Sequence, residues 1–138
     1  AMEGISRGIG FERTIVLFID AETYQLIPRF VTAKNSERIK QDFIISLKEN
    51  SIFRKILKDK KPIHIDKDSK SKIVQDPNFS VVCERGFCIA PLIVADRCIG
   101  MIYGDFLESN LPVAEDEYKA FNHFVLQTNL ALTIISQR

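Results

Sequence analysis

The sequence predicts an α/β chain of the α+β type, with an antiparallel sheet, helices packed on one face and an irregular flap on the other. Short runs of β-branched and aromatic residues are joined by brief polar turns, which indicates consecutive hairpins. Residues 114–137 have the periodicity of one long amphipathic helix. Residues 68–86 lack a regular period but keep apolar side chains, so we expect them to fold over the sheet.

The composition suits a single domain that spans residues 1–138. Hydrophobic residues make up 46% and charged residues 27%, as in ordinary soluble globular proteins. The net charge of +1 and the lack of a long apolar run give no reason to expect nucleic-acid or membrane binding. Three cysteines without disulfide spacing favour reduced thiols and a cytoplasmic location. The Ala1-Met2 start resembles a cloning remnant, so we expect a domain excised from a longer protein.

The first hairpin is expected at residues 14–32. Residues 14–20 are a dense run of β-formers, and residues 24–32 resume the pattern after a polar turn. Pro28 lies inside the second run and cannot donate to a ladder, which predicts an edge strand or a bulge.

A mixed region of short elements follows the hairpin. Residues 34–42 are polar and predict a short helical turn, and residues 43–47 predict a third strand. Ser51 is a suitable N-cap for a short amphipathic helix that ends before Pro62. Residues 62–66 then predict a brief strand.

The central element is a second hairpin at residues 87–106, with its turn at residues 95–97. Gly100 and Gly104 share one face of its second strand with Ile102. Glycine in a strand often marks close approach of another backbone, and we expect a helix packed on that face. The opposite face carries the side chains of Ile99, Met101, Tyr103 and Asp105.

The long helix has more apolar surface than one sheet normally buries. Its main stripe comprises Phe121, Phe124, Val125, Thr128, Leu132 and Ile135. Further apolar residues widen the stripe: Leu126, Leu130, Ala131 and Ile134. The surplus predicts a partner helix from a second copy, with Phe121, Phe124, Leu130 and Ile134 as the dimer contacts.

Two adjacent segments resemble GAF domains. They are Ala90-Pro91-Leu92-Ile93 and the glycine-containing strand Ile99-Gly100-Met101-Ile102-Tyr103. The order of the predicted elements is also similar to that family over nearly the whole chain. Tyr103-Gly104-Asp105 resembles the divergent GAF modules attached to bacterial HDOD signalling proteins.

The resemblance implies a sensory or regulatory domain with a small-molecule pocket, or its remnant, on one face of the sheet. It also implies an attached output domain and a homodimer formed through terminal helices. The asparagine-lysine-phenylalanine signature of cyclic-nucleotide-binding members is not visible. Cys83, Cys88 and Cys98 are more closely spaced than the cysteines of the free methionine sulfoxide reductases of this fold. We therefore expect no cofactor.

A small-molecule pocket is expected beneath the irregular segment. Its apolar side chains Phe79, Val82 and Cys83 are placed over the sheet face that carries Met101 and Tyr103. The candidate polar groups of the pocket are Arg29, His64, Tyr103 and Asp105. The alternative is that the apolar side chains simply fill this space.

Several single residues have both a functional and a structural interpretation. His64 and Asp66 form either a base or ligand anchor, or a surface pair. His123 is best explained as a buried or interface residue, and no metal site is expected. A Cys83 thiolate near Arg85 would have a lowered pKa and redox or chromophore chemistry, whereas a buried Cys83 only fills space.

Three functions follow from these patterns. The first is a small-molecule-binding sensory domain of a bacterial signal-transduction protein. The second is a ligand-free module for dimerisation or interaction. The third is a thiol-dependent reductase, which ranks last because no nucleophile, base and orienting group are evident together. The sequence therefore predicts a domain that is not an enzyme.

Overall fold

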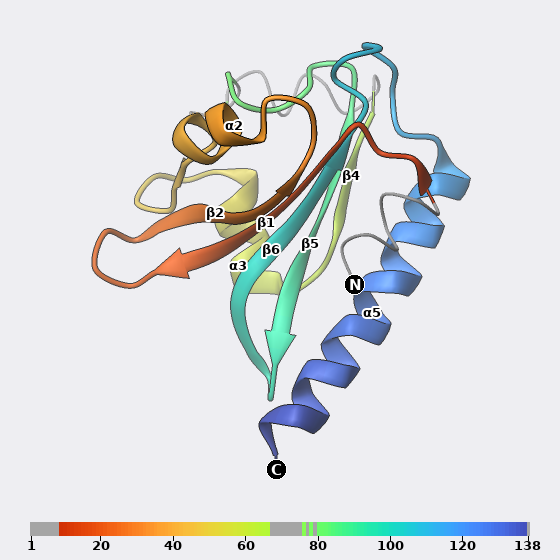
Figure 1. The fold of residues 1–138 in the computed structure, drawn as a ribbon. Helices are drawn as coiled ribbons and strands as arrows, with labels where there is room; N and C mark the ends of the chain where they lie inside the picture. Colours follow the sequence, from red (N-terminus) through yellow and green to blue (C-terminus); the bar gives the residue numbers. More distant parts are fainter. Residues whose placement is uncertain (1–8, 67–75, 77, 79, 138) are drawn as a thin grey trace.

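The computed structural model describes residues 9–66, 76, 78 and 80–137. Its sheet has six strands in the order β3-β2-β1-β6-β5-β4, and every neighbouring pair is antiparallel (Figure 1). The elements in chain order are β1 (Arg13–Asp20), β2 (Gln25–Thr32), α2 (Ser36–Asp42), β3 (Ile45–Ser46), α3 (Ile52–Asp59), β4 (Ile63–Ile65), β5 (Phe87–Val94), β6 (Arg97–Asp105) and α5 (Glu115–Ser136). The predicted α+β fold with an antiparallel sheet is confirmed.

The β1–β2 hairpin contains the irregularity predicted from Pro28. Val16 pairs with Phe30 and Leu17 pairs with Pro28, so Arg29 is the extra residue of a bulge. The neighbouring strand β3 pairs with β2 at two positions, Gln25 and Leu26, so Pro28 lies beyond that ladder. The predicted bulge is confirmed, whereas β2 is not an edge strand, because it lies between β3 and β1.

The two glycines of β6 each leave room for a specific neighbour. A Cβ added at Gly100 would lie 2.0 Å from the carbonyl oxygen of Leu17 in β1. The expected close approach of a backbone is thus correct, but that backbone belongs to the sheet. A Cβ added at Gly104 would lie 2.5 Å from the ring of Phe11. Neither glycine accommodates a helix backbone, which corrects that detail of the prediction.

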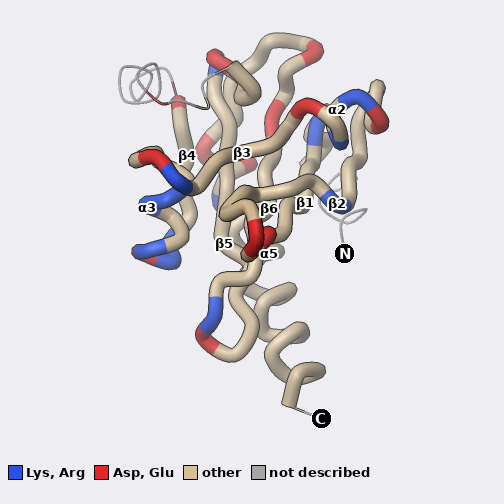
Figure 2. Tube along the Cα trace, turned by 90° about the vertical axis from the view of Figure 1, so that its left-hand side faces the viewer, with Lys and Arg blue, Asp and Glu red and all other residues tan. Residues whose placement is uncertain are grey.

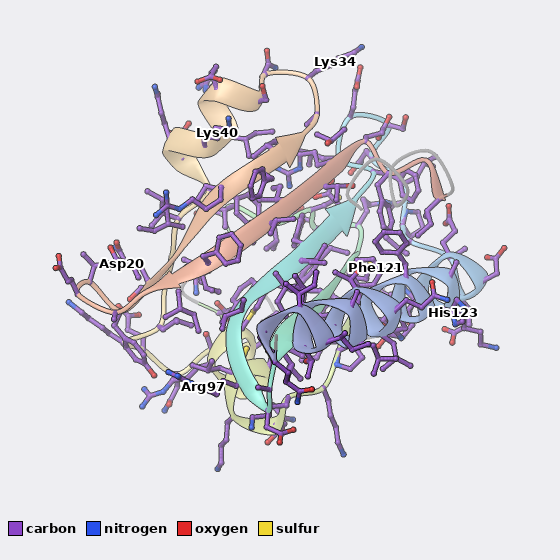
Figure 3. All side chains as sticks on the ribbon, turned by 60° about the horizontal axis from the view of Figure 1, so that its bottom comes forward. Asp20, Lys34, Lys40, Arg97, Phe121 and His123 are labelled. Carbon is purple, nitrogen blue, oxygen red and sulfur yellow. The ribbon has the colours of Figure 1, made fainter. Side chains whose placement is uncertain are left out.

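One face of the sheet packs against the long helix α5. Its buried cluster comprises Phe11, Cys88, Ala90, Leu92, Ile102, Val113, Phe121 and Val125. In Figure 3, Phe121 points from α5 toward the sheet, and it is fully buried. Ile102 belongs to this cluster, so the predicted helix does cover the glycine face of β6.

The opposite face is covered by α2, α3 and the described end of the irregular segment. Its cluster comprises Ile15, Leu17, Leu26, Phe43, Ile45, Leu47, Phe53, Ile56, Ile65, Val82, Phe87, Ile89, Met101 and Tyr103. The described end of that segment lies on this face as expected, with Val82 in the cluster. The two short helices lie there too, whereas the sequence placed the helices together on the other face.

The connection between α2 and α3 is less regular than the sequence suggests. Residues 43–47 were expected as a strand, but β3 covers Ile45–Ser46 alone. Phe43 instead ends α2, because its N–H donates to the Ile39 carbonyl, and its ring enters the core. The start of α3 is as predicted, since the Ser51 hydroxyl accepts the Arg54 N–H at 3.2 Å.

The helix α5 begins at a capping interaction and remains apolar on its outer side. The Glu117 carboxylate accepts the N–H of Ala114 at 2.8 Å, and acidic residues fill the first turn, where the helix dipole favours them. The outer residues Leu126, Leu130, Ile134 and Ile135 are 57–61% exposed. No helix among the described residues is both long enough and apolar enough to cross a membrane.

Candidate ligand-binding site

A buried ion pair joins the outer ends of two neighbouring strands. The antiparallel register places Arg13, at the start of β1, directly opposite Asp105, at the end of β6. The Arg13 Nη2 lies 2.6 Å from Asp105 Oδ2, and Nε lies 3.0 Å from both carboxylate oxygens. The side chains are 11% and 0% exposed, so this pair is shielded from water.

Tyr103 completes a polar cluster with this pair. Its hydroxyl donates to Asp105 Oδ2 at 2.5 Å and accepts the backbone N–H of Cys83 at 3.0 Å. Burial raises the pKa of Tyr103 well above its ordinary value, and the charge of Asp105 acts in the same direction. The phenol therefore keeps the proton that it donates. We call Arg13, Tyr103 and Asp105 the latch.

The charge of Arg13 is stabilised within the latch. Burial opposes that charge, but the hydrogen bond to Asp105 and the negative charge of its carboxylate raise the pKa of Arg13 overall. The guanidinium carbon also lies 5.3 Å from the ring centre of Phe43 and 5.6 Å from that of Tyr103. The guanidinium is therefore held in one orientation.

The latch fixes residues 80–83 over the sheet. Arg13 Nη2 donates to the Val81 carbonyl at 3.2 Å, and the Tyr103 hydroxyl accepts from Cys83 as described above. A second anchor lies earlier in the segment, where the Asp76 carboxylate accepts the Ile52 N–H at 2.8 Å at the start of α3. The irregular segment is thus attached through specific polar contacts as well as through Val82 in the core.

A cleft of about 520 Å³ opens beside the latch. It lies between α2, the start of β1, residues 80–82 and the loop after β6. The lining residues are Glu12, Arg13, Lys34, Asn35, Arg38, Ile39, Asp42, Phe43, Ser80, Val81, Val82, Leu107 and Glu108. Most of the lining surface is apolar, and its volume is within the usual range of small-molecule sites, about 300–1,000 Å³.

Charged side chains stand at the rim of the cleft. Lys34 pairs with Glu108 at 2.7 Å, and Arg38 pairs with Asp42 at 3.5 Å. Figure 3 shows Lys34 reaching outward from the connection into α2. Figure 2 shows positive and negative residues interspersed around α2. The rim therefore carries both signs of charge.

The structure brings part of the predicted pocket together. Val82, Cys83, Tyr103 and Asp105 are neighbours at the latch and are all buried. Met101 is fully buried in the core, and Phe79 lies outside the described residues. The ring centres of Phe43 and Phe87 lie 4.9 and 5.2 Å from that of Tyr103. Side chains therefore fill the space over Tyr103, and the open cleft lies to one side of it.

Two predicted residues are placed elsewhere. His64 pairs with Cys88 in the sheet and faces α5, where its Nε2 lies 2.7 Å from the Val113 carbonyl and its ring stacks on Tyr118. Arg29 is exposed at the bulge of β2 and does not line the cleft. The structure thus joins neither residue to Tyr103 and Asp105.

Arg13 is the main residue that sequence reasoning missed. Residues 3–13 were interpreted as a lead-in turn, whereas Arg13 is the first residue of β1. A basic residue at one strand end and an acidic residue at another are a usable signal, but only when the register between the strands is known. Lys34 and Arg38 at the rim carry no local signal of their own.

The cysteines do not support the alternative of thiolate chemistry at Cys83. Burial raises the pKa of the Cys83 thiol, although the sequence suggested a lowered pKa next to Arg85. Burial likewise raises the pKa values of Cys88 and Cys98. The reactive thiolate is disfavoured at all three positions. Among the described residues, no group of three or more histidine, cysteine or acidic side chains is arranged to hold a metal ion.

The predicted dimer contacts divide into two groups. Phe121 is fully buried against the sheet, and Phe124 is half-buried beside the same cluster. Leu130 and Ile134 are exposed on the outer side of α5. Phe121 therefore belongs to the core of its own subunit, and this part of the predicted dimer surface is wrong.

The comparisons with known proteins identify the fold. No protein-family model matches the sequence, and no curated protein does. Among solved structures, residues 122–287 of a methyl-accepting chemotaxis protein match with a TM-score of 0.72 and 18% identity, covering 99% of this chain and 86% of that one. The GAF domain/HD domain protein of Geobacter sulfurreducens matches with a TM-score of 0.72 and 14% identity, and the alignment covers 99% of this chain and 92% of that one.

A third match agrees with these two. The second GAF domain of DevS from Mycobacterium smegmatis has a TM-score of 0.73 and 16% identity, and the alignment covers 99% of this chain and 90% of that domain. All three structures thus align with 99% of this chain at TM-scores of 0.72–0.73. The chain has the fold of GAF domains.

Proposed function

We propose that this domain is a sensory, regulatory module of a bacterial signal-transduction protein, and that it responds to a small molecule bound in the cleft. The similar structures include a chemotaxis protein and a DevS domain, which supports a place in signalling. The observation that carries the proposal is the cleft of about 520 Å³, because the latched residues 80–82 form one of its walls. A ligand there contacts a segment that is held by a few specific polar bonds and by Val82 in the core.

The chain offers a route from the cleft to α5. Residues 80–83 lead through Gly86 into β5, and α5 packs on that strand. The Asn129 side chain accepts the Ile93 N–H at 3.0 Å and donates to the Pro91 carbonyl at 3.1 Å. A change at residues 80–83 therefore reaches α5 through β5. A ligand biases this route if it binds the two arrangements of the segment with different affinity.

Native mass spectrometry of gently purified protein, followed by a metabolite screen, tests the proposal. We expect a retained or added small molecule whose binding is lost in Ile39→Trp, which fills the cleft. Thr23→Trp, in the exposed β1–β2 turn, is the matched control and should bind normally. Absence of any binder, or a binder unaffected by Ile39→Trp, contradicts a sensor that uses this cleft.

A second candidate function is dimerisation without a ligand. Leu126, Leu130 and Ile134 recur every four residues on the exposed side of α5, and residues 120–137 contain no Asp, Glu, Lys or Arg. Figure 2 shows this absence of charge along the end of the helix. Sedimentation velocity should show a dimer that Leu130→Arg disrupts, with Thr23→Arg in the exposed β1–β2 turn as the control. A wild-type monomer contradicts this candidate.

The wider setting is part of the same proposal. We propose a cytoplasmic homodimer with an attached output domain, for which HDOD is the first candidate, and we assign no catalytic step to this chain. The raised pKa values of the thiols disfavour the reactive thiolate and so argue against the reductase alternative. A thiol-dependent turnover that Cys83→Ser abolishes would overturn that judgement.

A further inference from the structure

The charged groups around the cleft are already paired with one another. Arg13 pairs with Asp105, Lys34 with Glu108, and Arg38 with Asp42. Glu12 also lines the cleft, and its carboxylate accepts the Ser109 N–H at 2.8 Å and hydroxyl at 2.6 Å. Among the described residues, three cations and three carboxylates line the cleft, and the buried Asp105 behind Arg13 is a fourth carboxylate. Together these groups have a formal charge of −1.

This arrangement disfavours an anionic ligand. The exposed pairs at the rim break easily, but freeing Lys34 also frees Glu108 beside the same cleft. The total charge that an anion meets therefore does not change. Arg13 is held by the buried Asp105, so its charge is already matched. A phosphate or dicarboxylate would lose its hydration without finding a cation that lacks a partner.

One edge of the Arg13 guanidinium has no acceptor among the described residues. The contacts to Asp105, Val81 and Tyr103 use Nε and Nη2. Within the described part of the chain, no acceptor is seen for Nη1, and Arg13 lines the cleft. A guanidinium whose charge is matched still benefits from a neutral acceptor such as a carbonyl oxygen. An ammonium group has donors only, so it cannot accept from this edge.

The remainder of the cleft suits an apolar body. Ile39, Phe43, Val82 and Leu107 supply aliphatic and aromatic surface around it. Phe43 and Val82 are 2% and 5% exposed, so this part of the wall is firmly packed. Apolar contacts with one or two directed polar groups are the usual composition of small-molecule sites.

We propose that the cleft selects an uncharged amphipathic compound with a carbonyl group at one end, such as an amide, ester or lactone. The carbonyl oxygen accepts from Arg13 Nη1, and the apolar body lies against Ile39, Phe43 and Leu107. This inference rests on the proposed sensory function and adds the chemical class of the ligand.

Three probes with one apolar body and different head groups test the charge preference: 4-propylbenzamide, 4-propylbenzoate and 4-propylbenzylamine. Their dissociation constants are measured by saturation-transfer NMR, and ¹H–¹⁵N spectra locate the site. We expect the benzamide to bind about fivefold or more tighter than either charged probe, the factor that one hydrogen bond provides. The shifted amides should include those of Ile39 and residues 80–83. Tighter binding of the benzoate or the benzylamine, or no benzamide binding, overturns the proposal.

Two variants test the contact with the head group and the contacts with the apolar body separately. Ile39→Trp should abolish benzamide binding, whereas Thr23→Trp should leave it unchanged. Arg13→Lys keeps the charge but removes the planar donor edge, and should weaken benzamide binding about fivefold. Unchanged binding in both Ile39→Trp and Arg13→Lys overturns the assignment. If a charged metabolite from the screen binds in the cleft instead, the sensory function stands and this inference fails.

Discussion

The two faces of the sheet are stabilised in different ways. The face under α5 is an apolar cluster that includes Leu92, Ile102 and Phe121. The other face has an apolar core too, but its edge is closed by three buried polar side chains that hold an irregular segment. The first face depends on burial, which is non-directional, and the second depends on the geometry of particular atoms.

This difference indicates where the molecule is able to respond to a ligand. An apolar helix–sheet contact tolerates substitutions of similar volume and has no single controlling bond. The latch joins one residue of β1, two of β6 and the backbone of residues 81 and 83, so one change affects all of them. The cleft lies against the second of these two regions, and the following predictions test the contrast.

The largest effect is expected for Asp105→Asn. This nearly isosteric change leaves the buried Arg13 charge without its partner and should lower the free energy of unfolding by about 3–5 kcal/mol. Urea denaturation measures it. Glu108→Gln removes a carboxylate from the exposed Lys34 pair and is the control, with an expected loss of about 0–1 kcal/mol. Equal losses in the two variants would show that the latch is not a buried ion pair.

Tyr103→Phe should have the next largest effect. It removes the hydroxyl that accepts from Cys83 and donates to Asp105, while the ring stays in the core. We expect a loss of about 1–3 kcal/mol in urea denaturation, because a buried N–H loses its acceptor. Tyr118→Phe on α5 is the matched control and should change stability little, since its ring contact with His64 remains. A neutral Tyr103→Phe would contradict the proposed attachment of residues 80–83.

The same tyrosine predicts how stability depends on alkaline pH. Burial raises the pKa of Tyr103, so the folded protein keeps its phenol protonated where the unfolded chain, with a tyrosine pKa of about 10, loses that proton. The contribution of Tyr103 to the free energy of unfolding is present below pH ~10 and decreases above it, because unfolding then releases a proton. For this one group, the decrease in the free energy of unfolding approaches about 1.4 kcal/mol per pH unit.

Burial also raises the pKa values of the cysteines. Their ionisation therefore also lowers the free energy of unfolding as the pH rises, beginning at a somewhat lower pH. Urea unfolding of wild type and Tyr103→Phe between pH 8 and 11 isolates the tyrosine. The wild-type curve should fall more steeply above pH ~10. Parallel curves would mean that the phenol is accessible to water in the folded protein.

The smallest effect is expected on the α5 face. Leu92 is 3% exposed and packs in the apolar cluster beneath α5. Leu92→Met nearly conserves volume and should cost less than about 1.5 kcal/mol. Leu92→Asp is the disruptive control. A loss from Leu92→Met as large as that from Asp105→Asn would remove the contrast between the two faces.

Sequence reasoning recovered the features that depend on local pattern. Alternation correctly placed Met101 and Tyr103 on the face opposite Ile102, and Ser51 and Pro28 marked a helix start and a bulge. The long helix was also foreseen, as was the position of residues 80–83 over the sheet. These features depend on residues close in the chain, so a single sequence contains them.

The missed features depend on register between distant strands. Arg13 and Asp105 are far apart in the sequence and meet because β1 and β6 pair in one register. His64 was assigned to the wrong face because alternation within a three-residue strand does not specify which side faces α5. The strand predicted at residues 43–47 is shorter because Phe43 is the C-cap of α2, where its N–H donates to the Ile39 carbonyl.

Amide hydrogen exchange at Cys83 tests most directly whether the latch holds the irregular segment over the sheet. The account predicts a protected Cys83 amide in the wild-type protein, because it donates to the buried Tyr103 hydroxyl. In Tyr103→Phe that protection should fall by more than that of the Ile102 amide in β6. Rapid exchange of Cys83 in the wild type, or equal changes at Cys83 and Ile102, would contradict it.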